Sequence, residues 1–147
     1  MRVAIASDHG GFDQKGEIAR YMQDELACEV TDLGPDTGDS VDYPDFAAKV
    51  AHAVANGEAD YGVLICGTGI GMALSADKVP GVRASSITSV PFAELFRQHN
   101  NGNVVCLSGR FVDVEDNEAI VKAFLTTDFE GGRHERRVAK IMELDEE

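Results

Sequence analysis

A cysteine followed by three alternate glycines, Cys66-Gly67-Thr68-Gly69-Ile70-Gly71, is the segment best suited to chemistry. Alternate glycines let a backbone turn tightly and approach a ligand closely. The free N–H groups of a following helix favour an anion, and they also favour the thiolate form of a cysteine. A glycine-rich connector around a buried cysteine fits the spacing equally well. The spacing excludes the GxGxxG loop of dinucleotide-binding folds and the Walker A loop.

Two histidine segments offer groups that titrate near neutral pH. Asp8-His9 pairs a hydrogen-bond acceptor with an imidazole, which suits acid–base work. Asp8 could instead cap a helix that begins near Phe12, with His9 in solvent. His99-Asn100 lies before the last expected strand, where Asn100-Asn101-Gly102 is also good turn chemistry.

Basic residues gather near the carboxyl end of the chain. Arg133 and Arg137 are four apart and share a helix face, which Lys140 extends. Arg110 follows a predicted strand and could join an anion site. Arginine side chains suit phosphate oxygens, although a solvated basic face that pairs with the acidic tail is the alternative. His52 and His134 have no evident partner, and no HxH or HExxH motif supports a metal site.

Composition restricts the class of protein. The chain has 147 residues and a net charge of −13, so its surface repels nucleic acid and anionic membranes. No apolar run approaches the roughly 20 residues of a membrane span, and the first residues do not resemble a signal peptide. Three scattered cysteines form no disulfide framework. We therefore expect a cytoplasmic protein without nucleic-acid or membrane partners.

Short apolar runs alternate with amphipathic segments, which predicts one α/β domain over residues 1–147. The expected strands are Val3–Ala6, Glu29–Leu33, Gly62–Cys66, Arg83–Ile87 and Val104–Leu107. The expected helices cover 12–26, 70–76, 90–98 and 113–125, and a last helix starts at about 132. One more lies between the first two of these, with Phe46, Val50, Ala53 and Val54 at helical spacing. This pattern is typical of a three-layer Rossmann or flavodoxin-like fold with a five-stranded parallel sheet in the order 2-1-3-4-5. Ligands bind such sheets where the strand order reverses, between strands one and three.

That position brings the Asp8-His9 loop beside the Cys66 loop. Tyr43, in the acidic loop that leads into the second helix, could line a pocket. His99 precedes strand five and so lies at the opposite edge of the sheet. If His99 is catalytic, it must reach the pocket of another subunit, which predicts a symmetric dimer.

Five motifs in order resemble the ribose-5-phosphate isomerase B family. They are Ser7-Asp8-His9-Gly10-Gly11, Asp42-Tyr43-Pro44, the Cys66–Gly71 loop, Arg97-Gln98-His99-Asn100 and Gly131-Gly132-Arg133-His134-Glu135-Arg136-Arg137. The resemblance implies a homodimer or dimer of dimers, no cofactor and no metal. It also implies interconversion of ribose 5-phosphate and ribulose 5-phosphate, a step of the pentose phosphate pathway. One branch of the family uses a cysteine base and another a glutamate; this sequence has no glutamate from Gly67 to Pro80 and resembles the cysteine branch.

The resemblance also implies roles for single residues. Cys66 moves the proton between C2 and C1 through an enediolate. This intermediate is stabilised by Thr68 and by the backbone N–H groups from Gly67 to Gly71, which include that of Gly69. Asp8 and His99 open the sugar ring. The phosphate ligands are His9, Arg133 and Arg137, with Arg110 possible, and Asn100 and Tyr43 contact the sugar.

Other phosphosugar functions stay open. Ala76-Asp77-Lys78 stands where the family usually has Ala-Asn-Lys, and Ser86–Ser89 is more polar than usual. Such changes could adapt the same machinery to a six-carbon phosphosugar of the allose 6-phosphate or galactose 6-phosphate type. A non-catalytic phosphosugar-binding module is the alternative from another class, although it would not need Cys66, Thr68 and His99. A flavin carrier is disfavoured because the chain has no tryptophan to flank the ring.

Overall fold

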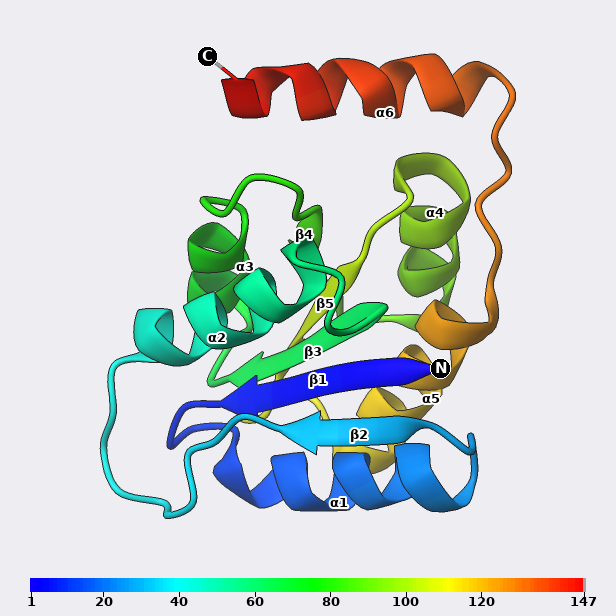
Figure 1. Cartoon of the computed structure of the whole chain (residues 1–147). Helices are drawn as coiled ribbons and strands as arrows, with labels where there is room; N and C mark the ends of the chain where they lie inside the picture. Colours follow the sequence, from blue (N-terminus) through cyan, green and yellow to red (C-terminus); the bar gives the residue numbers. More distant parts are fainter. Residues whose placement is uncertain (147) are drawn as a thin grey trace.

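A computed structural model describes residues 1–146 and contains one sheet of five parallel strands (Figure 1). The strands are β1 (Arg2–Ser7), β2 (Glu29–Asp32), β3 (Tyr61–Cys66), β4 (Ala84–Ser86) and β5 (Val104–Ser108). The predicted α/β class and parallel sheet are confirmed. The order is β2-β1-β3-β5-β4, so the predicted order of the last two strands is wrong. The fully buried β5 takes the inner position, and the short, half-buried β4 lies at the edge.

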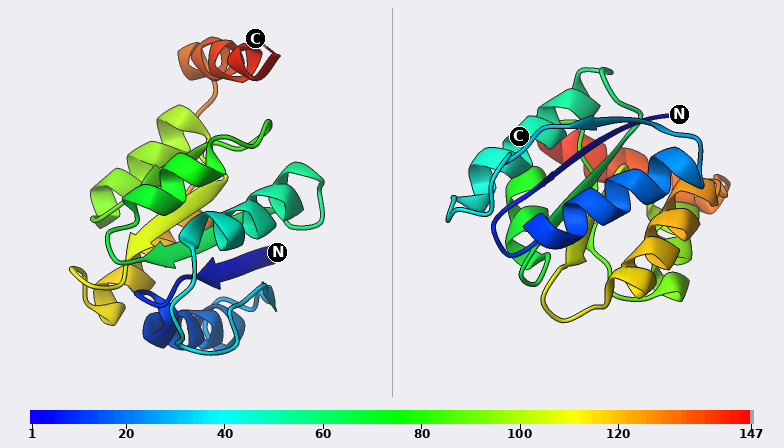
Figure 2. Two further views of the ribbon diagram at one scale, coloured as in Figure 1. Left: turned by 90° about the vertical axis from the view of Figure 1, so that its left-hand side faces the viewer. Right: turned by 90° about the horizontal axis from the view of Figure 1, so that it is seen from below.

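Helices cover both faces of the sheet (Figure 2). They are α1 (Phe12–Asp24), α2 (Tyr43–Ala55), α3 (Ile70–Ala76), α4 (Val90–Asn100), α5 (Val114–Thr126) and α6 (Arg133–Glu143), followed by a 3-10 turn at Leu144–Glu146. One hydrophobic cluster joins the sheet to α1, α4 and α5, and a second joins it to α2 and α3. These are the three predicted layers.

The last helix, α6, is attached differently from the others. It begins at Arg133, close to the expected start, and only His134 and Val138 of it are buried. The turn after it is fixed by Asp145, whose carboxylate accepts a hydrogen bond of 2.8 Å from the N–H of Gly81. Among residues 1–146, no helix combines the length and apolar character needed to cross a membrane.

Main-chain hydrogen bonds join the loops at the carboxyl ends of β1, β3 and β5. The Asp8 N–H donates to the carbonyl of Ile65 (3.1 Å), the Gly109 N–H to that of Cys66 (2.8 Å), and the Arg110 N–H to that of Gly67 (3.2 Å). The three loops therefore form a common floor, held by these backbone bonds and by the Ser108 hydroxyl, which donates to the Gly67 carbonyl (2.7 Å).

Candidate active site

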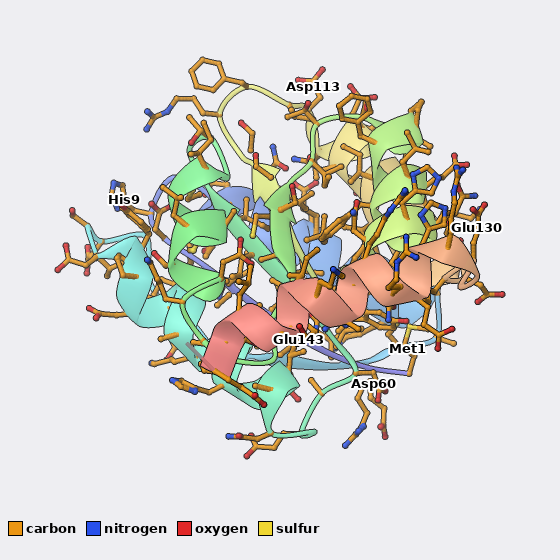
Figure 3. All side chains as sticks on the ribbon, turned by 90° about the horizontal axis from the view of Figure 1, so that it is seen from above. Met1, His9, Asp60, Asp113, Glu130 and Glu143 are labelled. Atoms are coloured by element: carbon orange, nitrogen blue, oxygen red, sulfur yellow. The ribbon has the colours of Figure 1, made fainter. Side chains whose placement is uncertain are left out.

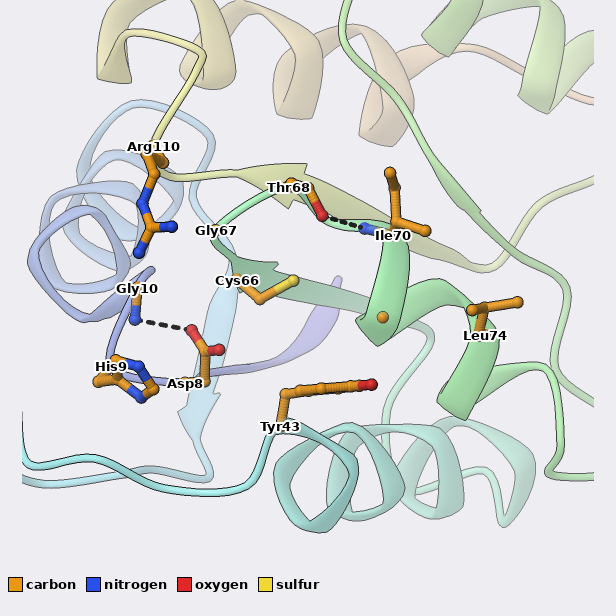
Figure 4. Close-up of a pocket in the computed structure, with 11 residues that line it drawn as sticks. Asp8, His9, Gly10, Tyr43, Cys66, Gly67, Thr68, Ile70, Leu74 and Arg110 are labelled. Atoms are coloured by element: carbon orange, nitrogen blue, oxygen red, sulfur yellow. Dashed lines mark hydrogen bonds between the residues drawn. The ribbon is translucent and has the colours of Figure 1, made fainter.

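A cavity of about 480 Å³ opens above this floor (Figure 4). It lies between β1 and β3, as the strand pattern predicts. Its lining comes from the loops after β1, β3 and β5, from the start of α2 and from α3. The lining residues are Asp8, His9, Gly10, Tyr43, Cys66, Gly67, Thr68, Ile70, Gly71, Leu74 and Arg110. Eight of these were predicted as site residues from the sequence.

Cys66 is the last residue of β3 and lies in the middle of the cavity wall (Figure 4). Its side chain is 5% exposed, and its Sγ accepts a hydrogen bond of 3.1 Å from the N–H of Gly69. A donor aimed at the sulfur favours negative charge there. Gly69 has a φ of +83°, and a Cβ on it would lie 3.1 Å from the Leu107 carbonyl. Gly69 thus acts through the shape of the loop and is not itself among the lining residues.

Thr68 follows in the same loop with its hydroxyl at the cavity. The Thr68 Oγ1 accepts a hydrogen bond of 3.2 Å from the Ile70 N–H. Because that N–H fills one acceptor position, the hydroxyl proton stays available for an oxygen of a ligand. The N–H groups of Gly69 and Ile70 are already used within the loop, so the predicted row of free backbone donors is shorter than expected.

Asp8 and His9 form the wall that belongs to the loop after β1. Asp8 is buried, and its Oδ1 accepts hydrogen bonds from the N–H groups of Gly10 (2.8 Å) and Gly11 (3.2 Å). It closes the turn before α1, whose N-cap is Gly11. His9 accepts a hydrogen bond of 3.4 Å at Nδ1 from the Val41 N–H. In its neutral form the imidazole therefore carries its proton on Nε2, which can donate to an anion.

Tyr43, the first residue of α2, packs against Gly71 in α3. A Cβ on Gly71 would lie 2.5 Å from Tyr43 Cε1, so only glycine leaves room for the ring. The Tyr43 side chain is 40% exposed and forms one side of the cavity (Figure 4).

Arg110 supplies a cation to the cavity. Its guanidinium lies over the loop after β3, with Cζ 3.6 Å from where a Cβ of Gly67 would be. No carboxylate of residues 1–146 lies within ion-pair distance of it. In Figure 4, Arg110 and His9 lie on one side of Cys66, and Ile70 and Leu74 lie on the other. The cavity thus has a polar end that suits an anion and an apolar end.

Besides Gly69, four predicted site residues do not line this cavity: His99, Asn100, Arg133 and Arg137. His99 and Asn100 form the end of α4, which is longer than expected; Asn101 closes the helix with φ +48°. Asn100 lines a separate cavity of about 420 Å³ beside β4 and the last helix. Arg133 and Arg137 are exposed on α6.

His99 instead belongs to a cluster with Glu130 and His134. The rings of His99 and His134 are stacked, with centroids 4.3 Å apart and planes 12° apart. His134 Nε2 lies 3.5 Å and His99 Nε2 3.9 Å from Glu130 Oε1. Glu130 and His9 lie on opposite sides of the molecule in Figure 3. The cluster and the cavity of one chain are therefore well separated.

The expectation that His134 lacks a partner is wrong. His134 is buried against His99, and Glu130 precedes it by four residues. The pKa of His134 is lowered, first by desolvation and then by the positive charges of His99 and Arg133. The negative charge of Glu130 opposes this shift. The spacing of Glu130 and His134 was visible in the sequence, but nothing there indicated that His99 would stack on them.

Ile70 and Leu74 line the cavity but were not predicted as site residues. They are four apart in α3 and are 57% and 65% exposed. Apolar residues at this spacing usually face a protein core. Their exposure at the rim of a cavity could be seen only once the helix was placed against the sheet.

The family of the chain follows from comparison with known proteins. The family model described as Ribose/Galactose Isomerase matches residues 3–141. The chain belongs to the ribose/galactose isomerase family. The resemblance seen in the sequence motifs is thereby confirmed. Within this family, ribose-5-phosphate isomerase B of Escherichia coli is 42% identical over 145 residues, which are 99% of this chain and 97% of that protein.

Solved structures of the ribose/galactose isomerase family match the whole fold. Ribose-5-phosphate isomerase B of Clostridium thermocellum superposes with a TM-score of 0.97 at 45% identity, covering 99% of this chain and 98% of that one. Ribose-5-phosphate isomerase B of Mycoplasma genitalium was solved with bound ribulose 5-phosphate. It has a TM-score of 0.94 and 47% identity, over 99% of this chain and 97% of that chain.

Proposed function

We propose that this chain interconverts ribose 5-phosphate and ribulose 5-phosphate, with Cys66 as the base. The observation that carries the proposal is the presence of a buried thiol and an arginine without a carboxylate partner, among residues 1–146, in one cavity. The Escherichia coli relative is named ribose-5-phosphate isomerase B, and the Mycoplasma genitalium structure holds ribulose 5-phosphate. Proton transfer between adjacent carbons needs no redox cofactor. A cytoplasmic location keeps free thiols reduced and suits a thiolate base.

The polar end of the cavity would hold the phosphate, and the proton transfer would take place in the middle, at Cys66 and Thr68. Arg110 and the Nε2–H of His9 would bind the phosphate through charge-assisted hydrogen bonds. The Cys66 thiolate would take the proton from C2, and the resulting thiol would return a proton to C1. An enediolate lies between these steps. The Thr68 hydroxyl, whose oxygen already accepts from Ile70, would donate to the developing oxyanion.

Ring opening requires groups that move protons at the sugar oxygens. Asp8 lines the cavity and would exchange a proton with one sugar oxygen. His99 would exchange a proton with the other sugar oxygen only from a second subunit, because it does not line the cavity of its own chain. We therefore propose a homodimer in which Asn100, Arg133 and Arg137 also act across the interface. The exposed apolar side chains of Ile70 and Leu74 at the rim support a partner surface there.

The test is an assay of ribose 5-phosphate conversion in EDTA, with wild-type protein beside Cys66→Ala. General-base catalysis contributes about 10²–10⁴-fold, so kcat should fall by that factor in the variant. Circular dichroism and a thermal melt check that the variant is folded. Cys28→Ala, at another buried cysteine, is the matched control and should keep its activity.

Two outcomes would change the proposal. Full activity in Cys66→Ala would remove Cys66 as the base and keep the isomerase. If neither protein acts on ribose 5-phosphate, allose 6-phosphate and galactose 6-phosphate are the next substrates. Phosphosugar binding without turnover of any of them would identify a binding module instead.

A further inference from the structure

We infer that His99, Glu130 and His134 form a binding site for Zn²⁺ or a similar divalent transition metal, and that the bound metal inhibits the isomerase. One potential ligand atom of each side chain lies within 4.8 Å of the other two. The three residues come from the end of α4, the segment before α6 and the first turn of α6. They lie outside the cavity described above.

The spacing of the ligand atoms is close to what a tetrahedral ion requires. Zinc–nitrogen bonds of about 2.0–2.1 Å place neighbouring ligand atoms roughly 3.3 Å apart. Glu130 Oε1 lies 3.5 Å from His134 Nε2 and 3.9 Å from His99 Nε2. Both Nε2 atoms therefore lie near the same carboxylate oxygen. The two Glu130 distances exceed that spacing by a few tenths of an ångström, and one ligand atom from each of the three side chains lies within 4.8 Å of the others. Because the rings are stacked with planes 12° apart, they must splay before both nitrogen lone pairs point at one ion.

The ligand types select the class of metal. Two imidazole nitrogens and one carboxylate oxygen suit Zn²⁺, Ni²⁺ or Cu²⁺, whereas Mg²⁺ and Ca²⁺ prefer six or more oxygen ligands. Three protein ligands leave a fourth position for water. The side chains of His99 and Glu130 are 39% and 51% exposed in the single chain, so no part of their own subunit keeps an ion from them.

Backbone contacts hold the cluster together. The Glu130 N–H donates to the carbonyl of Gln98 (3.1 Å), next to His99. The His134 N–H donates to the carbonyl of Gly131 (3.0 Å), next to Glu130. The side chain of His134 is only 10% exposed and stacks on His99, which limits its rotamers. A site whose ligands are already positioned loses little entropy when it binds a metal.

Inhibition rests on the proposed function. If His99 exchanges protons with the sugar of the partner subunit, a metal on its Nε2 would occupy the nitrogen that must act. EDTA would then raise activity in a preparation that contains Zn²⁺, although the reaction itself uses no metal.

The binding test is calorimetric titration of ZnCl₂ into the full chain carrying Cys66→Ala, which removes the cavity thiol as a competing ligand. We expect one Zn²⁺ per chain. Adding Glu130→Gln, at an exposed position, should weaken binding at least tenfold, and adding His134→Gln should do the same. Adding His52→Gln, an exposed histidine on α2, is the matched control and should leave binding unchanged. MgCl₂ should give no comparable binding.

Equal Zn²⁺ affinity with and without Glu130→Gln, in protein that melts normally, would overturn the site. So would comparable binding of Mg²⁺. Inhibition is tested separately, by turnover of the chain with Cys66 intact at increasing ZnCl₂. We expect Glu130→Gln to need at least tenfold more Zn²⁺ for half inhibition than the unsubstituted chain. Equal sensitivity would overturn the inhibitory role. A chain that binds Zn²⁺ at this site but never turns over ribose 5-phosphate would refute the proposed function and retain the site.

Discussion

Arg110 differs from the other arginines of the proposed phosphate site because it lies in the cavity of its own chain. Its guanidinium lies beside Gly67, and no carboxylate of residues 1–146 neutralises it. In a protein with a net charge of −13, an uncompensated cation at a cavity is a specific attraction for an anion. At the scale of single residues, binding of the substrate's phosphate should therefore depend strongly on the Arg110 side chain.

Arg110→Gln should raise KM for ribose 5-phosphate about tenfold or more and change kcat less. The reason is that hydrogen bonds to charged groups contribute roughly 1.5–3 kcal/mol, and this one would be present in both ground and transition states. Steady-state kinetics measure the effect, with Arg20→Gln on α1 as the control. A fall in kcat at unchanged KM would mean that Arg110 does not bind the ground-state phosphate.

At the scale of elements, the sequence predicted which segments become strands and helices but not every position in the sheet. The loops after β1 and β3 were placed together correctly, because parallel strands put their carboxyl ends at one edge. The exchange of β4 and β5 was missed because the sequence order of strands does not fix their spatial order. The signal was present in composition: Ala84-Ser85-Ser86 is polar, whereas Val104–Ser108 is almost entirely apolar and becomes fully buried.

The contact between β3 and α2 depends on a residue without a side chain. A Cβ on Gly62 would lie 2.5 Å from Val50 Cγ1 and 3.1 Å from Val104 Cγ2. Gly62→Ala should therefore lower the free energy of unfolding by about 1–3 kcal/mol through overpacking. In contrast, a Cβ on Gly16, in the middle of α1, would meet nothing within 4 Å. Gly16→Ala should raise the free energy of unfolding by about 0.5–1 kcal/mol. Urea denaturation of both variants checks the pair; the same sign in both would contradict the packing argument.

The connection from α3 to β4 contains a carboxylate that opposes folding. Asp77 Oδ1 accepts a hydrogen bond of 2.7 Å from the Ala84 N–H. Desolvation, with a contribution from nearby Asp145, nevertheless raises the pKa of Asp77 above its ordinary value of 3.8. A carboxyl whose pKa is higher in the folded state binds its proton more tightly there. Its cost to stability is absent below about pH 3.8 and grows as the pH rises through the folded pKa.

Asp77→Asn should consequently raise Tm modestly at pH 7, since the amide oxygen can still accept from Ala84. Melts at pH 7 and pH 3 measure the difference, which should disappear at the lower pH. Asp128→Asn, in an exposed position, is the control. If the higher Tm of Asp77→Asn persists at pH 3, the charge of Asp77 is not the cause of the difference.

At the scale of the whole molecule, the single chain brings together only part of the expected site. Asp8, His9, Tyr43, Cys66, Thr68 and Arg110 share one cavity, whereas His99, Asn100, Arg133 and Arg137 lie elsewhere. The strand polarity predicted this separation for His99. The sequence could not predict the separation of the two α6 arginines, because a helix that follows the last strand has no fixed place relative to the sheet.

Mixing two inactive variants tests the shared site. After subunit exchange, Cys66→Ala and His99→Ala proteins should regain roughly a quarter of wild-type activity, because half of the dimers are mixed and each has one intact site. Turnover of the mixture, compared with each variant alone, measures the recovery. Absence of recovery, with exchange confirmed by mass spectrometry of labelled subunits, would count against a site shared between subunits.

The main-chain floor of the cavity has a consequence for how such proteins diverge. Hydrogen bonds between peptide groups join the three loops, so they persist whatever side chains the neighbouring positions acquire. The rim is different: Tyr43 projects from the start of α2, and Ile70 and Leu74 project from α3. Mutations there can reshape the space for the sugar while the thiol and the cation stay in place. A lineage with this architecture can thus exchange one substrate for a longer one in small steps, without first losing its chemistry.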